Sequence, residues 1–165
     1  MADSLTFMMG KFAAVLPTDR RYARNHMWCL SVPPPHPQPL SPEGERGANA
    51  LRFGFTTYAV RLMQDVYFLD WELSAGDTVT LKQKIGHIET SKAMSDLFAP
   101  IAGTLARFNA DLLNDPSAIN VDMYGNGWLF EMTTISEAET LNVEEYVAFL
   151  EAGWEKTQNM LKGHM

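Results

Sequence analysis

The middle of the chain carries its hydrophobic residues in short runs separated by turn residues, a pattern typical of antiparallel β-strands. Val66-Tyr67-Phe68-Leu69 is a compact apolar run of residues that favour strands. Residues 127–132 form a similar run, which predicts a late core strand. Ala75-Gly76-Asp77 and Tyr124-Gly125-Asn126-Gly127 are typical turn sequences. This part of the chain is therefore predicted to be mostly β.

Helical spacing appears near the two ends of the chain and at one point between strands. Near the C-terminus, apolar side chains recur at steps of three and four residues, which predicts an amphipathic helix packed on the rest of the fold. The positions are Tyr146, Val147, Leu150, Trp154, Thr157 and Leu161. Residues 109–120 predict a short helical turn limited by Pro116. Residues 4–16 show weak helical periodicity, and residues 1–19 are interpreted as an N-terminal extension.

The segment 33–49 differs in composition from the rest, with six prolines within its first ten residues. Proline lacks a backbone N–H and favours extended, solvated chain, so a central strand is excluded here. Two interpretations remain open. The segment is either a neutral surface-loop insertion or a proline-rich ligand for an aromatic groove on a partner.

Length and charge restrict the function classes. A chain of 165 residues with 46% apolar and 20% charged residues fits one globular domain, predicted over residues 20–165. A net charge of −7 argues against a nucleic-acid surface, which needs clustered cations. No apolar run reaches the ~20 residues of a membrane span, and no secretory signal is evident. We therefore expect a cytoplasmic monomer without a nucleic-acid or membrane partner.

Cys29 is the single cysteine, so the chain cannot form an internal disulfide, and no Cys/His cluster has zinc spacing. Cys29 and the nearby His26 could be a nucleophile and base, but a small apolar role for Cys29 on a strand is favoured. A thiol hydrolase would also need an oxyanion setting, and the sequence offers no glycine-rich one. Neither a catalytic nor a metal-binding residue is predicted.

Lys92 lies between two strand-like runs, Val79–Ile88 and Leu97–Ala106, where a tight turn would expose its amine. By residue type alone, a lysine in this position is usually a solvated edge charge that opposes aggregation. Its neighbours, Glu89-Thr90-Ser91-Lys92-Ala93, change this interpretation. They resemble the Glu-Ser-x-Lys-Ala sequence of the glycine cleavage H-protein family, within the biotinyl/lipoyl attachment domains.

Further stretches resemble that family in the same order along the chain. They are Arg21-Tyr22 with Asn25-His26-Met27-Trp28, then Phe53–Ala59, Asp65–Asp70, Ala75–Val79, Asn109–Asn120 and Tyr124–Phe130. The resemblance implies a barrel-sandwich hybrid of the lipoyl-domain kind. It also implies that lipoic acid is attached covalently to Lys92, with Glu89, Ser91 and Ala93 as the recognition context. Glu89 is equally well explained as a solvated strand charge, and Asp96 as a turn residue.

By this resemblance the protein is a non-catalytic carrier of the glycine cleavage system, because a group carrier such as lipoamide supplies the chemistry while the fold supplies position. The arm would carry an aminomethyl group and reducing equivalents between glycine decarboxylase, an aminomethyltransferase and dihydrolipoyl dehydrogenase. A lipoate ligase or lipoyl transferase would load it. His26 and Trp28 are assigned to the N-terminal strand and Trp128 to the core, without catalytic roles.

The chain departs from the family pattern at two further points. Gln64 replaces a glycine, and Met27 replaces the usual glutamate after the histidine. A lipoyl carrier of another pathway and an unmodified scaffold or regulatory protein therefore remain alternatives. A biotinyl carrier is disfavoured, because its Ala-Met-Lys-Met sequence has methionine where this chain has Ser91.

Overall fold

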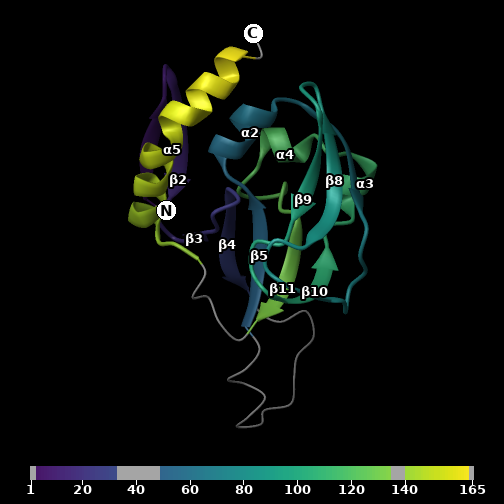
Figure 1. Ribbon diagram of the computed structural model, residues 1–165. Coiled ribbons are helices and arrows are strands. Elements are labelled where there is room, and N and C mark those ends of the chain that lie inside the picture. Colours follow the sequence, from purple (N-terminus) through teal and green to yellow (C-terminus); the bar gives the residue numbers. More distant parts are fainter. Residues whose placement is uncertain (1–2, 33–48, 135–139, 164–165) are drawn as a thin grey trace.

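The computed structural model describes residues 3–32, 49–134 and 140–163, and within them the chain is mostly β (Figure 1). The strands are β1 (Ser4–Met9), β2 (Phe12–Pro17), β3 (Arg21–Tyr22), β4 (Met27–Val32), β5 (Asn49–Phe55), β6 (Val66–Trp71), β7 (Thr78–Val79), β8 (Lys84–Thr90), β9 (Met94–Phe98), β10 (Gly103–Phe108) and β11 (Phe130–Thr134). The helices are α2 (Thr57–Met63), α3 (Asp111–Asn114), α4 (Ala118–Val121) and α5 (Val143–Gly163). The predicted fold class is confirmed.

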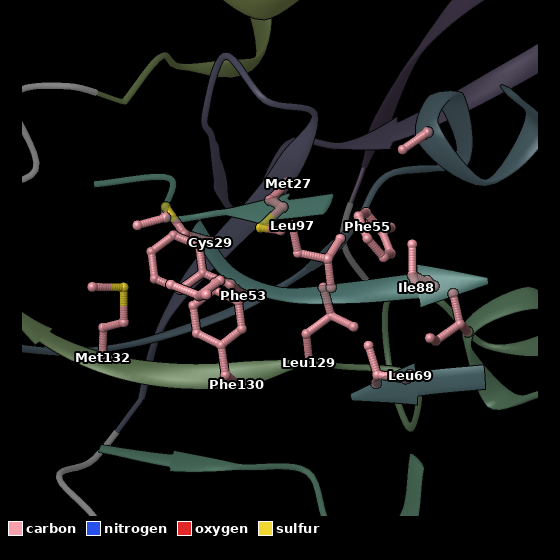
Figure 2. Packing of buried hydrophobic residues seen from close by; sticks show 14 of the residues in the cluster. Met27, Cys29, Phe53, Phe55, Leu69, Ile88, Leu97, Leu129, Phe130 and Met132 are labelled. Atoms are coloured by element: carbon pink, nitrogen blue, oxygen red, sulfur yellow. The ribbon is translucent and has the colours of Figure 1, made fainter. Parts of the chain in front are cut away.

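Two antiparallel sheets enclose the main core. One has the strand order β3-β4-β5-β11-β10-β7, and the other has the order β6-β8-β9. Aromatic and aliphatic side chains from the inner faces of both sheets meet between them, as Figure 2 shows. Those labelled are Met27, Cys29, Phe53, Phe55, Leu69, Ile88, Leu97, Leu129, Phe130 and Met132. This arrangement is the sandwich that the resemblance implied.

The two runs predicted as strands on either side of Lys92 each cross from one sheet to the other. Before the lysine, β7 pairs with β10 in the larger sheet, while β8 pairs with β6 and β9 in the smaller one. Lys82 lies between β7 and β8 with φ 69°, a left-handed conformation that breaks the strand. After the lysine, Pro100 lies in the gap between β9 and β10. Each strand-like run is therefore divided between two strands that belong to different sheets.

The N-terminal residues form a β-hairpin, so the helical periodicity read over residues 4–16 was misleading. β1 and β2 pair in register from Ser4↔Pro17 to Met9↔Phe12, and Gly10 turns the chain with φ 66°. One face of the hairpin is buried and carries Phe7, Met9, Ala14 and Leu16. Three adjacent apolar residues, Phe7-Met8-Met9, obscure the alternation that identifies a strand. The hairpin shares a hydrophobic core with later residues of the chain. The domain boundary at residue 19/20 stays a prediction.

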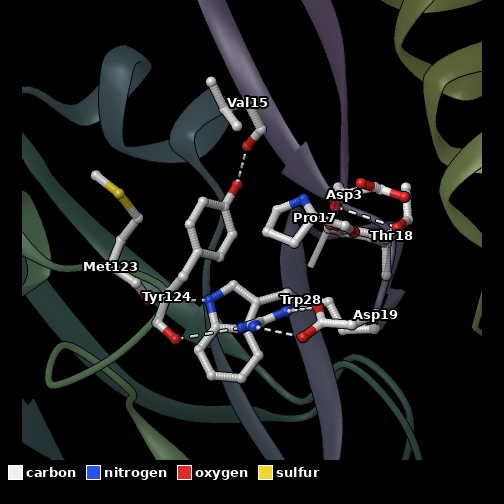
Figure 3. Close-up of polar contacts among 10 residues, drawn as sticks. Asp3, Val15, Pro17, Thr18, Asp19, Trp28, Met123 and Tyr124 are labelled. Atoms are coloured by element: carbon white, nitrogen blue, oxygen red, sulfur yellow. Dashed lines mark hydrogen bonds and ion pairs between the residues drawn. The ribbon is translucent and has the colours of Figure 1, made fainter. Parts of the chain in front are cut away.

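That second core lies between the hairpin, α2 and α5. Phe7 contacts Trp154 edge-on at a centroid distance of 5.7 Å, and Tyr58 at 6.0 Å. The hairpin is also tied to the loop before β11 (Figure 3), where Tyr124 donates a hydrogen bond to the carbonyl of Val15. Trp28, buried on β4, donates to the carbonyl of Met123 at 3.0 Å.

Both predicted helical segments are confirmed. α3 and α4 lie on either side of Pro116, and α5 buries Tyr146 and Leu150. A capping box begins α5: the Glu145 amide donates to the Asn142 side chain at 2.8 Å, and the Asn142 amide donates to the Glu145 carboxylate at 2.9 Å. Within the described residues, no helix is both long enough and apolar enough to cross a membrane.

A buried carboxylate links three strands of the larger sheet. Glu131 on β11 lies opposite Arg52 on β5 and Arg107 on β10, and both arginines donate to it at 2.8 Å. Burial by itself would raise the pKa of Glu131, but the hydrogen bonds from Arg107 and Arg52 outweigh it and lower that pKa. Both guanidinium groups also lie over the ring of Trp128, at 4.4 and 5.2 Å. Trp128, which lies just before β11, therefore packs over the ion pairs that Glu131 forms with the two arginines.

The proline-rich insertion predicted at 33–49 lies outside the described residues, except that Asn49 begins β5. β4 and β5 pair from Met27↔Phe55 to Val32↔Ala50, so the two ends of the segment are joined across neighbouring strands. A surface loop leaving such a pair can be lengthened at about 0.6 kcal/mol of closure free energy per doubling of its length. The neutral-insertion and partner-groove interpretations both stay predictions.

His26 lies in the turn before β4 rather than in the strand, with φ 69°. Its Nδ1 lies 2.8 Å from the hydroxyl of Tyr146, and its ring packs 4.8 Å from that of Tyr58. Burial lowers the pKa of His26 from its usual 6.5 to about 4, because the charged imidazolium would lose its hydration. The native protein therefore holds this histidine neutral at physiological pH.

We expect this partly buried histidine to make the protein less stable in acid. The folded pKa is below the unfolded one, so the stabilisation is complete above about pH 6.5 and is lost as the pH falls toward 4. The loss should reach about 3 kcal/mol. The matched variant is His26→Asn, because asparagine tolerates the left-handed backbone. The free energy of unfolding, measured in urea at several pH values, should fall less steeply with decreasing pH in this variant than in the wild type. Identical slopes would contradict the assignment.

Candidate functional site

Lys92 occupies the tip of the hairpin formed by β8 and β9, as predicted. The hydroxyl of Thr90 organises this turn: it accepts the backbone amide of Lys92 at 3.2 Å and that of Ala93 at 3.3 Å. The amide of Thr90 in turn donates to the carbonyl of Ala93 at 3.0 Å. The threonine hydroxyl thus accepts hydrogen bonds that a backbone carbonyl accepts in other turns, as is common in turns formed by serine and threonine.

A second contact ties the tip to a neighbouring loop. The amide of Ser91 donates to the carbonyl of Asp65 at 2.9 Å. Both sides of Asp65 are held by Asn120 on α4, whose Oδ1 accepts the Val66 amide at 2.9 Å and whose Nδ2 donates to the Gln64 carbonyl at 2.8 Å. Asn120 therefore positions the backbone on which the lysine turn rests.

Gln64 ends α2 in a conformation that suits glycine. Its φ is 64° and its ψ is −146°, a combination that a side chain with Cβ adopts at a cost of about 1–3 kcal/mol. This is the position where the resemblance places glycine, so the departure from the family pattern falls on a strained residue. The strain is next to Asp65 and is held in place by the hydrogen bond from Asn120.

The surroundings of the lysines distinguish Lys92 from Lys84. The ammonium group of Lys92 is exposed and makes no hydrogen bond or ion pair with the part of the chain that the structure describes. Lys84 instead contacts Glu72 at 3.2 Å and Asp96 at 3.3 Å. Hydrogen bonds to Glu72 first and to Asp96 second raise the pKa of Lys84, so its amine is both occupied and charged.

Lys11 provides an internal comparison, because it too lies in a hairpin turn. Gly10 and Lys11 connect the last pair of the N-terminal hairpin, Met9↔Phe12, and Lys11 is exposed. That turn is made by the positive φ of Gly10, whereas the Lys92 turn is made by the hydroxyl of Thr90. Exposure at a hairpin tip is therefore not unique to Lys92.

The other predicted site residues lie where the motif placed them. Glu89 lies on β8, opposite Met94 on β9 and Phe68 on β6. Its carboxylate makes no hydrogen bond or ion pair within the described ranges, so it is not required to hold the hairpin. Ser91 and Ala93 flank the lysine, and both are exposed. Asp96 is a strand residue paired with His87, not a turn residue.

The nucleophile–base pair considered for Cys29 and His26 is not assembled. Cys29 is buried in the main core between the sheets, while His26 contacts Tyr146 and Tyr58 in the second cluster. Among the described residues, no group of three His, Cys, Asp or Glu side chains is arranged to hold a metal ion. A surface hollow of about 640 Å³ includes Phe98, at the opposite end of β9 from the tip, and does not include Lys92. Lys92 thus lies outside this hollow, at an exposed hairpin tip.

Comparisons with known proteins agree on one family. Residues 45–153 match the family model described as glycine cleavage H-protein. The chain is 32% identical over 134 residues to the glycine cleavage system H protein of Streptomyces coelicolor, covering 81% of this chain and 95% of the relative. It is 34% identical over 134 residues to the H protein of Alteromonas mediterranea, covering 79% of this chain and 92% of the relative.

A solved structure is also similar. The crystal structure of a glycine cleavage system H protein from Mycobacterium marinum superposes with a TM-score of 0.64 at 31% identity. The match covers 81% of this chain and 97% of that one. The similarity in fold therefore extends over nearly the whole of the relative.

The position of Lys92 was predictable from the sequence, but the residues that hold its turn were not. Thr90 stands two residues before Lys92, where a hydroxyl that folds back on the turn is a recognisable signal. Asn120 lies 28 residues after Lys92, and nothing in the sequence between them indicates that they meet. The carbonyl of Asp65 is a backbone group, so its contact with Ser91 cannot be predicted from the type of residue at position 65.

Replacing Asn120 should loosen the lysine turn. In Asn120→Leu the Val66 amide and the Gln64 carbonyl lose their partners, and leaving such groups unpaired costs about 1–3 kcal/mol. We expect lower stability in urea and faster hydrogen exchange at the Ser91 amide. Asn114→Leu, at an exposed asparagine on α3, is the matched control and should leave both unchanged. Unaltered Ser91 exchange in Asn120→Leu would contradict the positioning role.

Replacing Gln64 by glycine should stabilise the protein. Relief of the backbone strain outweighs the greater flexibility of glycine in the unfolded chain, for a net gain of about 1 kcal/mol. The comparison is with Gln64→Ala, which removes the same side chain but keeps the strain and should give no gain. Thermal and urea unfolding measure both. A Gln64→Gly protein no more stable than Gln64→Ala would show that the conformation is not strained.

Proposed function

This chain belongs to the glycine cleavage H-protein family, whose members are non-catalytic lipoyl carriers of the glycine cleavage system, and we propose that Lys92 is the residue that carries the lipoyl group. The observation that carries the proposal is the position of Lys92: an exposed amine without a described partner, on a turn held by Thr90 and Asp65. An amide between this amine and the carboxyl group of lipoic acid would replace a charged group that the fold does not use.

The geometry fits a carrier because its rigid and flexible parts are separate. The turn is fixed to two other parts of the chain through Ser91 and Asn120, while the lysine side chain is a flexible four-carbon stem. When bound, lipoic acid supplies a cyclic disulfide that opens to a dithiol, and the protein supplies its position. A long arm on a fixed base visits several active sites by raising its local concentration there.

The partners are the other components of the glycine cleavage system. We propose a glycine decarboxylase that loads an aminomethyl group, an aminomethyltransferase that removes it, and a dihydrolipoyl dehydrogenase that reoxidises the dithiol. A lipoate ligase or a lipoyl transferase would install the arm. Glu89, Ser91 and Ala93 are proposed as the context that the installing enzyme recognises. With a net charge of −7, the carrier suits transient docking on basic surfaces.

Lys92→Arg should abolish both lipoylation and function. Arginine keeps the charge but offers no amine for the amide, so intact mass after incubation with lipoate and a lipoate ligase should stay at the unmodified value. Lys11→Arg, at the other hairpin tip, is the matched control and should be lipoylated as fully as the wild type. Peptide mapping that finds lipoyl on Lys82 or Lys84 would overturn the assignment.

The loaded carrier should then act only with its partner enzymes. Lipoylated wild type should be reduced by dihydrolipoyl dehydrogenase acting in reverse, with a reduced nicotinamide cofactor as the electron donor. It should also support glycine–bicarbonate exchange with a glycine decarboxylase. The unmodified protein should support neither. Reduction without exchange would move the carrier to another lipoyl-dependent pathway. Absence of both, with lipoyl confirmed by mass, would leave the scaffold interpretation.

A further inference from the structure

The outward face of the three-stranded sheet has two zones. At the end away from Lys92, Lys84 joins Glu72 and Asp96 in ion pairs, with His87 3.4 Å from Glu72. Nearer the tip, Phe68, Glu89 and Met94 form one row across β6, β8 and β9. The charged groups of the first zone have partners within the protein. In the second zone, the ring of Phe68 contacts that of His87 at a centroid distance of 5.8 Å, whereas the carboxylate of Glu89 has no partner among the described residues.

The row points away from the core. Alternate residues of a strand face opposite sides of a sheet. The inward positions are buried between the sheets and are held by Leu69 on β6, Ile88 on β8 and Leu97 on β9. Phe68 is 45% exposed and Met94 is 64% exposed. Large apolar side chains gathered on one surface usually mark a contact with another molecule. Glu89 lies between them, with a carboxylate that has no partner among the described residues.

The other hairpin tip lacks this row. At the positions equivalent to Glu89 and Met94, the Lys11 hairpin has Met8 opposite Ala13. Within the described residues its sheet has two strands, and none of them takes the place of β6, which brings Phe68 beside Glu89. The Lys11 tip therefore offers an exposed lysine without a carboxylate between two large apolar side chains. An enzyme that modifies Lys92 and not Lys11 can therefore distinguish the two tips by this row as well as by the turn.

The reach of an unmodified lysine limits how far from the tip that enzyme can bind. The four-carbon stem spans about two residues of strand, which rises about 3.3 Å per residue. Met94 is two residues from Lys92 along the chain, and Glu89 and Phe68 share its row. An enzyme whose active site receives the amine must therefore bind close to the tip, near the end of the sheet where this row lies. An enzyme that receives the end of a lipoyl arm is free of that limit.

We propose that Phe68, Glu89 and Met94 form the docking surface for the enzyme that lipoylates Lys92, an inference that rests on the proposed function. The partner is a lipoate ligase or lipoyl transferase with an apolar surface for Phe68 and Met94 and a cationic side chain for Glu89. The row directs modification to Lys92 rather than to Lys11. It is not required once the arm is in place.

The test compares loading with later use of the arm. Purified apo-protein is incubated with a lipoate ligase, and the rate is followed by intact mass. Phe68→Thr/Met94→Thr should lower kcat/KM for lipoylation about tenfold, as loss of central interface contacts does, and Glu89→Gln should lower it less. Val15→Thr/Leu113→Gln removes exposed apolar side chains elsewhere, 41% and 52% exposed, and should load normally. Thermal unfolding confirms that each variant is folded.

Two further measurements make the result specific. After prolonged loading, the Phe68→Thr/Met94→Thr protein should be reduced by dihydrolipoyl dehydrogenase at the wild-type rate. In Lys92→Arg, Lys11 should stay unmodified. Wild-type loading rates in the folded variants, or lipoylation of Lys11, would overturn the docking surface while leaving Lys92 as the lipoyl site. A wild-type protein that is not lipoylated on Lys92 would overturn both proposals.

Discussion

The side chain of Asn120 holds together the parts of the chain on which the lysine turn depends. Buried backbone groups must be hydrogen-bonded, and a turn between a helix and a strand leaves some of them without partners. Asn120 supplies an acceptor for Val66 and a donor for Gln64, so Asp65 between them is fixed with its carbonyl toward Ser91. One amide thus couples α4, the end of α2 and the start of β6 to the hairpin. The same side chain donates a hydrogen bond to the carbonyl of Gln64, whose backbone conformation is strained.

The base of the same hairpin is restrained in a different way. The chain enters β8 from β7 and leaves β9 for β10, and β7 and β10 pair with each other in the larger sheet. The two ends of the hairpin are therefore held near each other by the pairing of β7 with β10. Fixed at the base by strand pairing and near the tip by Asp65, it presents Lys92 in one direction. A carrier needs this, because disorder at the tip would have to be removed each time a partner binds.

Residues with local causes were predictable from the sequence, and those with distant causes were not. The β6 strand, the helices around Pro116, the α5 helix and the exposed Lys92 follow from short-range patterns of hydrophobicity and turn residues. The sheet crossings were missed because an apolar run looks the same whether it stays in one sheet or leaves it, and Lys82 gives no sign of its left-handed backbone. Asn120 was missed because its role depends on folding that brings distant segments together. The N-terminal hairpin was misread because Phe7-Met8-Met9 fits either period.

The second core joins the two ends of the chain, and this has a consequence for synthesis on the ribosome. The main core is built from residues between Met27 and Met132, whereas the second core needs both Phe7 and Leu150, with Trp154 packed against it. Domains form as the chain emerges, N-terminal residues first. The hairpin of residues 4–17 is therefore made early but finds its partner helix last, after the lysine turn and the sheets around it have been synthesised. Until then its buried face, with Phe7 and Leu16, lacks the cover of α5, and completion of the C-terminal helix is the step that closes the molecule.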